Sequence, residues 1–118
     1  MIDDIQISNT LKIKFTHDSE ADLLSPGKKL TLFRIIQEQL KNILTHSQAN
    51  ETEIHLQCRN STVMLIIKDN GTGFNSKLTR RGIGLSTIFE RTRFYNGTTT
   101  IETAPGKGCL LKILMPAA

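Results

Sequence analysis

The sequence has few of the features that mark secreted, fibrous or membrane-spanning proteins. It contains no Trp, one Tyr, three Pro and two Cys among 118 residues. No segment approaches the roughly 18–20 apolar residues that a membrane-spanning helix needs. The amino-terminal residues also lack the basic and apolar parts of a signal peptide. We therefore expect a soluble, cytoplasmic segment that makes no membrane contact.

The two cysteines are too few to form a metal site by themselves. A disulfide framework is not expected in a reducing compartment. Because lone cysteines tend to lie in protein cores, Cys58 and Cys109 are predicted to be buried free thiols.

Concentrated positive charge is also lacking. The net charge is +4, but the 15 Lys and Arg residues are scattered, and only Lys28-Lys29 and Arg80-Arg81 are adjacent. Such a spread is typical of a solvated surface, so we expect no nucleic-acid partner.

The composition is that of one globular domain. Hydrophobic residues make up 38% and charged residues 22%, and this length suffices for one core but not for two ordinary domains. We therefore treat residues 1–118 as a single domain.

The hydrophobic pattern predicts alternating strands and helices. Alternation predicts strands at 11–15, 53–57, 63–68, 99–103 and 110–114. A helical period follows Ser25-Pro26-Gly27 and continues to about His46, with an apolar sector made of Leu32, Phe33, Ile36, Leu40, Ile43 and Leu44. A second helix is predicted at 84–94, with its inner face formed by Leu85, Ile88, Phe89 and Thr92. This order indicates an α+β fold, a two-layer α/β sandwich with a mixed sheet covered on one face by helices.

Three polar residues recur every four positions on the first predicted helix. Glu38, Asn42 and His46 therefore lie along one flank. A carboxylate and an amide oxygen on this flank could help to hold Mg²⁺, which usually shares its oxygen ligands with phosphates. The alternative is a solvent-exposed polar face, which the stripe taken alone favours.

Two glycine-containing segments follow. Asp69-Asn70-Gly71-Thr72-Gly73 comes directly after an apolar strand, where an acid can read a ligand's amino group and glycines allow close backbone approach; the same residues are also common in turns. Arg81-Gly82-Ile83-Gly84-Leu85 comes at the predicted start of the second helix, where free N–H groups and the helix dipole suit phosphate. With the helix flank, these segments predict a common cleft.

These motifs together resemble a known family. Residues 32–46 resemble the N box of sensor histidine kinases, in particular the nitrate-sensor-like subclass. Residues 69–73 and 82–91 resemble the two glycine boxes, and residues 104–116 resemble the closing hairpin. The resemblance covers about residues 11–116. It extends to the GHKL superfamily, which includes gyrase, mismatch-repair and heat-shock chaperone ATPases, and it implies the Bergerat ATP-binding fold.

The resemblance implies roles for individual residues. Asn42 would ligate the Mg²⁺ that bridges the ATP phosphates, and Asp69 would accept the adenine amino hydrogen. Glu38 would be catalytic, by polarising the nucleophile or supporting the metal, and His46 or Lys41 would contact phosphate. The remaining pocket residues would be Gly71, Gly73, Gly82, Ile83, Gly84 and Leu85, and residues 74–81 would form a short lid with the cations Lys77, Arg80 and Arg81.

The implied activity is that of an ATP-dependent protein histidine kinase in a two-component signal transduction system. Such a domain donates the γ-phosphoryl group of ATP to a histidine on a separate dimerisation domain of the same sensor, and a response regulator acts downstream. None of His17, His46 and His55 lies in such a helical context. We therefore expect a fragment of a longer sensor, with or without a membrane anchor, that cannot autophosphorylate alone.

Two other interpretations remain open. One is a serine kinase similar to anti-sigma factors, although the amino-acid sequence of residues 34–38 and the short lid favour the histidine kinase. The other is a degenerate ATP-binding module without turnover. Intact Asn42 and Asp69 argue against it, but Cys109 stands where many family members carry Thr or Ser, and a thiol is a weaker hydrogen-bond partner for adenine.

Overall fold

The protein is one mixed sheet with helices on a single face. A computed structural model describes residues 2–6, 11–72, 85–103 and 106–117, and the side chains from residue 11 onward except those of residues 19, 22 and 46. The six strands have the order β1-β2-β3-β4-β6-β5. Their bounds are β1 Ile2–Gln6, β2 Lys12–His17, β3 Glu51–Arg59, β4 Thr62–Asp69, β5 Thr98–Thr103 and β6 Cys109–Pro116.

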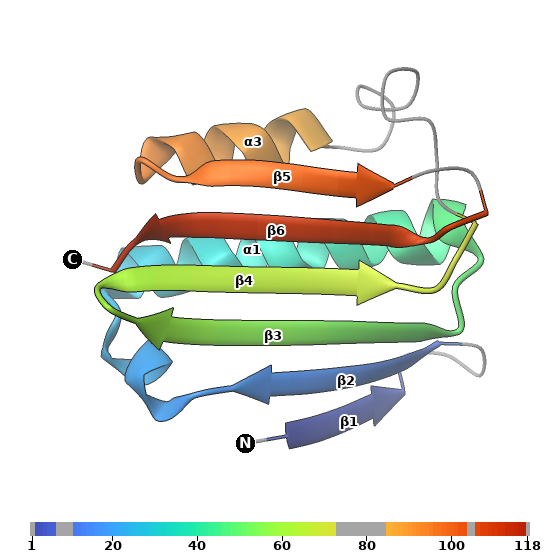
Figure 1. Ribbon diagram of the computed structural model, residues 1–118, viewed down its shortest axis with the longest axis horizontal. Coiled ribbons are helices and arrows are strands. Elements are labelled where there is room, and N and C mark those ends of the chain that lie inside the picture. Colours follow the sequence, from blue (N-terminus) through green and yellow to red (C-terminus); the bar gives the residue numbers. More distant parts are fainter. Residues whose placement is uncertain (1, 7–10, 73–84, 104–105, 118) are drawn as a thin grey trace.

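The pairing of strands β2 and β3 makes the sheet mixed. These two strands run parallel, and every other neighbouring pair is antiparallel. Helices α1 (Pro26–Asn42) and α3 (Leu85–Phe94) both lie behind the sheet in Figure 1. The predicted α+β sandwich, with a mixed sheet covered on one face, is therefore confirmed. None of the helices among the described residues is long and apolar enough to cross a membrane.

Alternation along the strands creates the core. Alternate residues of β4 and β6 point toward the helices and are buried, among them Leu65, Ile67, Leu111 and Ile113. Successive side chains in a strand point to opposite faces, so the other residues form the open face of the sheet. The predicted inner face of α3 is confirmed, because its residues either are buried or pack against this core.

The predicted apolar sector of the first helix is only partly its inner face, because Leu32 and Ile43 are buried and Ile36 and Leu40 pack against the core, but two of its members are exposed. Phe33 is 56% exposed and Leu44 is 46% exposed. The buried residues of α1 are instead Lys28, Leu32, Ile35, Gln39 and Asn42, so the buried face is rotated by roughly a quarter turn from the apolar sector. The reason is that three polar side chains belong to the buried face. Each of these is hydrogen-bonded; the Nζ of Lys28, for example, donates to the carbonyl oxygen of Pro116 at 2.7 Å.

Two further elements were not predicted from the sequence. Strand β1 begins the chain as an edge strand, and its acidic residues Asp3 and Asp4 obscure the apolar alternation; charge is common on edge strands because it discourages further pairing. A short 3-10 helix also spans Ser19–Leu23.

The end of α1 continues as a turn of π-helix, η2, at Ile43–Ser47. The predicted end near His46 is therefore close to the observed one. The turn ends at Gln48, whose φ of 56° is left-handed. Single π-turns often occur at functional sites, and this one leads directly to the loop beside Asp69.

Candidate functional site

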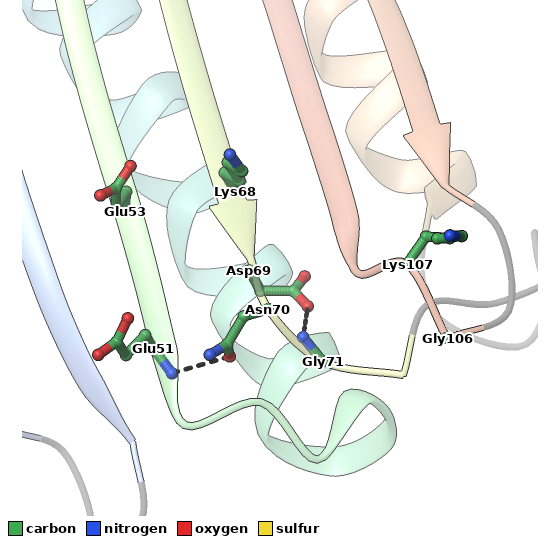
Figure 2. A pocket seen from close by; sticks show the side chains of 8 residues that line it. All are labelled: Glu51, Glu53, Lys68, Asp69, Asn70, Gly71, Gly106 and Lys107. Carbon is green, nitrogen blue, oxygen red and sulfur yellow. Dashed lines mark hydrogen bonds between the residues drawn. The ribbon is translucent and has the colours of Figure 1, made fainter.

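The candidate site lies at the end of the sheet where β4 finishes and β6 begins. Asp69 is the last residue of β4, and it is paired with Thr52 on one side and Cys109 on the other. Its side chain is on the helix-facing side and is only 4% exposed. Its Oδ1 accepts a hydrogen bond from the N–H of Gly71 at 2.8 Å (Figure 2). Burial raises the pKa of Asp69, and the hydrogen bond from Gly71 acts in the opposite direction.

Gly71 is required because the backbone of η2 passes very close to it. A Cβ at this position would lie 2.3 Å from the carbonyl oxygen of Ser47. The N–H of Thr72 donates to the same oxygen at 2.7 Å. The sequence indicated close backbone approach at this glycine, and the structure shows that the partner is the chain itself. The contact ties the segment that follows Asp69 to the end of the helical flank.

The turn before β6 closes over the same segment. Gly108 has a φ of +73°, and a Cβ there would lie 2.3 Å from the carbonyl oxygen of Asp69. The N–H of Gly106 donates to the carbonyl oxygen of Thr72. Gly108 was not singled out as a site residue from the sequence. The available signal was its place in the resemblance to the closing hairpin.

Asn70 holds the start of β3 against the end of β4. Its Oδ1 accepts from the N–H groups of Asn50 and Glu51, both at 3.1 Å. Its Nδ2 donates to Oδ1 of Asn50 at 2.6 Å. Figure 2 shows that the Asn70 side chain points toward β3, whereas the Asp69 carboxylate points toward Gly71.

The polar flank of α1 is partly inside the fold. Asn42 is 7% exposed, and its Nδ2 donates to Oε1 of Gln39 at 3.2 Å. The Nε2 of Gln39 donates to Sγ of Cys109 at 3.9 Å. A hydrogen-bonded chain thus runs from Asn42 to the first residue of β6. Glu38 lies on the same flank and is partly exposed, so the exposed-face interpretation is wrong for Asn42.

Cys109 is a buried, neutral thiol. Burial raises its pKa to about 12, and the neighbouring Asp69 carboxylate acts in the same direction. Cys58 is buried as well, and both cysteines are free. The prediction of buried free thiols is confirmed.

The remaining predicted site residues have different placements. The Leu85 side chain is fully buried in the core at the start of α3. The backbone of His46 belongs to η2. The segment predicted as the lid lies outside the described residues, as do four pocket residues, namely Gly73, Gly82, Ile83 and Gly84.

A cavity of about 500 Å³ borders Asp69 (Figure 2). Of the predicted site residues it includes Asp69 and Gly71. Several of its other lining side chains lie on the open face of the sheet or in the turn, namely Glu51, Glu53, Lys68 and Lys107. Because Glu53 and Lys68 are on the open face of the sheet, this cavity is on the face opposite to α1 and Asn42.

The donor chemistry of Asn42 fits a hard cation that is shared with a ligand. Its Nδ2 is engaged by Gln39, and within the described segments no group donates to its Oδ1. Nor do three His, Cys, Asp or Glu side chains converge as a metal site anywhere in that part of the chain. A single amide oxygen suits Mg²⁺, which usually keeps waters and takes further oxygens from phosphates.

Comparison with known proteins identifies the family. The family model of histidine kinase-, DNA gyrase B- and HSP90-like ATPases matches residues 27–118. The signal transduction histidine-protein kinase/phosphatase DegS of Bacillus subtilis is 34% identical over 103 residues, which cover 84% of this chain and 27% of DegS. The sensor histidine kinase ComP of the same organism is 41% identical over 88 residues, covering 72% of this chain and 11% of ComP.

Solved structures share the fold. The Erythrobacter litoralis EL346 blue-light activated histidine kinase aligns with a TM-score of 0.76 at 14% identity, over 93% of this chain and 36% of that one. The ATP binding domain of PrrB from Mycobacterium tuberculosis aligns with a TM-score of 0.64 at 20% identity, over 75% of this chain and 68% of that one. This chain thus spans less than a third of the curated relatives DegS and ComP. It belongs to the histidine kinase-, DNA gyrase B- and HSP90-like ATPase family, as a catalytic domain of the sensor histidine kinase type.

Proposed function

We propose that this domain binds Mg-ATP and that Asp69 recognises the adenine base. The observation that carries the proposal is the buried Asp69 carboxylate, held by the Gly71 N–H at 2.8 Å. Among the described residues, no cationic side chain pairs with it. A buried carboxylate without a cation is costly unless it accepts enough hydrogen bonds. The 6-amino group of adenine would supply a donor that the described part of the protein lacks.

Asn42 would hold the metal end of the nucleotide. The Asn42 amide oxygen would help to hold Mg²⁺, and the bound ion would supply positive charge that neutralises the phosphates. The glycines after Asp69 and before α3, namely Gly71, Gly73, Gly82 and Gly84, would surround the nucleotide together with Ile83 and the backbone of Leu85. His46, which belongs to η2, would contact a phosphate of the nucleotide.

The domain would act as the ATP half of a histidine kinase. Glu38, one turn before Asn42 on α1, would polarise the attacking imidazole of a histidine on a separate dimerisation domain of the same protein. The bond from the γ-phosphorus to its bridging oxygen breaks, a phosphorus–nitrogen bond forms, and ADP leaves with the electron pair. A response regulator would then receive the phosphoryl group. The similarity to DegS and ComP supports this proposal.

Nucleotide binding tests the first part of the proposal. Asp69→Asn should weaken Mg-ATP binding about tenfold or more in isothermal titration calorimetry, because a hydrogen bond to a charged group contributes about 1.5–3 kcal/mol. Glu53→Gln is the matched control, since Glu53 lines the cavity on the open face of the sheet. Equal effects of the two substitutions would contradict adenine recognition by Asp69.

Phosphoryl transfer tests the second part. The domain, joined to the dimerisation domain of its own protein, should incorporate label from [γ-³²P]ATP as acid-labile, base-stable phosphate. Glu38→Gln should lower the rate of incorporation with little change in Mg-ATP affinity. Acid-stable phosphate would indicate a serine kinase, and Mg-ATP binding without incorporation would indicate a binding module without turnover.

A further inference from the structure

Gln39 is a buried amide between the two ends of the proposed nucleotide site. It is 1% exposed, although it lies on a helix with ample exposed positions. Its Oε1 accepts from Asn42, and its Nε2 donates to Cys109. A buried amide is costly unless its polar atoms are paired. In this case the oxygen and the nitrogen of Gln39 each have one partner, one from α1 and one from β6.

The hydrogen bond from Asn42 to Gln39 determines which end of the Asn42 amide is free. Nδ2 points toward Oε1 of Gln39 at 3.2 Å, so Oδ1 is on the other side of the amide group. Rotating the Asn42 amide by half a turn would bring Oδ1 toward Oε1, and two acceptor oxygens would then face each other. It would also present N–H groups, which cannot ligate a cation, at the position that Oδ1 now has.

The bond from Gln39 to Cys109 holds the amide of Gln39 in turn. Cys109 is a neutral buried thiol and pairs with Asp69 across β4 and β6. Its sulfur is a weak acceptor, and it receives the Nε2 end of Gln39 at 3.9 Å. Reversing the Gln39 amide would direct Nε2 toward the Nδ2 donor of Asn42. The direction of the whole chain, from Asn42 through Gln39 to Cys109, is therefore self-consistent.

We propose that Gln39 is a positioning residue that keeps the amide oxygen of Asn42 directed toward the Mg²⁺ of Mg-ATP. This inference rests on the proposed function. Gln39 touches neither nucleotide nor metal and acts through Asn42. Groups that orient a metal ligand in this way typically change metal affinity by about 10- to 100-fold when they are removed.

The test compares ATP binding with and without Mg²⁺. Gln39→Met keeps an unbranched side chain of similar volume and removes the amide oxygen and the amide nitrogen. The ratio of the ATP dissociation constant in EDTA to that in Mg²⁺ should fall by about tenfold in Gln39→Met, while the constant in EDTA stays as in the wild type. A purely structural role would weaken binding equally in both conditions. An unchanged ratio would overturn the proposal.

A double-mutant cycle tests whether Gln39 acts through Asn42. In an Asn42→Ala background, Gln39→Met should no longer change the Mg²⁺ ratio. If Gln39→Met lowers the ratio as much without Asn42 as with it, the proposal is wrong.

A third measurement does not depend on nucleotide. In ¹⁵N NMR spectra of the free domain, the side-chain NH₂ protons of Asn42 should exchange with water more slowly than those of exposed Asn96. This protection should disappear in Gln39→Met. Unprotected Asn42 protons in the wild type would overturn the proposal, even if Gln39→Met fails to fold. Absence of ATP binding by the wild type, with these protons protected, would instead contradict only the proposed function.

Discussion

Alanine substitution of three glycines around Asp69 should destabilise the domain to three different degrees. A Cβ at Gly71 would lie 2.3 Å from the backbone oxygen of Ser47, and one at Gly108 would lie 2.3 Å from the backbone oxygen of Asp69. A Cβ at Gly106 would have no heavy atom within 4 Å. Gly106 and Gly108 have left-handed φ values of +78° and +73°. Gly106→Ala should therefore introduce backbone strain alone, whereas Gly108→Ala should introduce both backbone strain and steric overlap.

The expected costs follow from these two effects. Overlap with a backbone atom that must move costs about 1–3 kcal/mol, and at Gly71 it also disturbs the Thr72 hydrogen bond to Ser47, a further ~1 kcal/mol. A left-handed alanine costs roughly 1–2 kcal/mol. Alanine also restricts the unfolded chain more than glycine does, and this offsets the loss of stability by about 0.4–1 kcal/mol in each variant. The net loss should be about 1 kcal/mol for Gly106→Ala, about 2 for Gly71→Ala and about 3 for Gly108→Ala.

Urea denaturation followed by circular dichroism measures these losses, with Gly106→Ala as the matched control. In thermal melts, each kcal/mol should lower Tm by about 4 °C for a domain of this size. The result that would refute the reasoning is a Gly71→Ala loss no larger than that of Gly106→Ala. In that case the segment after Asp69 would not be held against η2 as described.

Three more outcomes follow from the packing and electrostatics. Burial raises the folded-state pKa of Asp69 above the ordinary value of about 3.9. Ionisation of Asp69 therefore lowers the stability of the domain as pH rises through that raised pKa. Asp69→Asn should raise Tm at pH 7, and melts below about pH 3.9 should show no such gain. On α1, Ile35→Ala should lower the free energy of unfolding by about 2–5 kcal/mol in urea denaturation because Ile35 is fully buried. Phe33→Ala should lower it by about 0.5 kcal/mol or less because Phe33 is exposed. Equal losses would show that Phe33 is as buried as Ile35. Asn70→Ala removes the three side-chain hydrogen bonds to Asn50 and Glu51. It should speed amide hydrogen exchange at these two residues and lower stability by about 1–2 kcal/mol. Unchanged exchange would show that the Asn70 side chain does not hold the start of β3.

The strands and the second helix could be predicted because their signals are local. Alternation in 63–68 and 110–114 identified β4 and β6 to within a few residues. The buried face of α1 could not be predicted in this way, because Gln39 and Asn42 are polar and are buried only through partners elsewhere in the fold. Strand β1 was missed because Asp3 and Asp4 interrupt the apolar alternation that identifies a strand.

In the candidate site, too, residues with a local sequence signal could be predicted, and residues whose roles depend on distant contacts could not. Asp69 and Gly71 could be identified because an acid and a glycine directly after an apolar strand form a short sequence pattern. Gln39 and Gly108 could not, because their roles arise from contacts with Cys109 and Asp69, which are 70 and 39 positions away along the chain. The resemblance pointed to Asn42 as a metal ligand, but the hydrogen bond that orients its amide is visible only in the folded chain.

The central claim is that the buried carboxylate at the end of β4 reads the amino group of adenine in Mg-ATP. The most direct measurement is calorimetric titration of the wild-type domain with Mg-ATP and, in parallel, with the Mg²⁺ complex of purine riboside triphosphate, which lacks the 6-amino group. The account predicts that Mg-ATP binds and that the analogue binds at least about tenfold more weakly, since the Asp69 carboxylate is then left without its ligand donor. Equal affinities for the two nucleotides, or no binding of Mg-ATP, would contradict it.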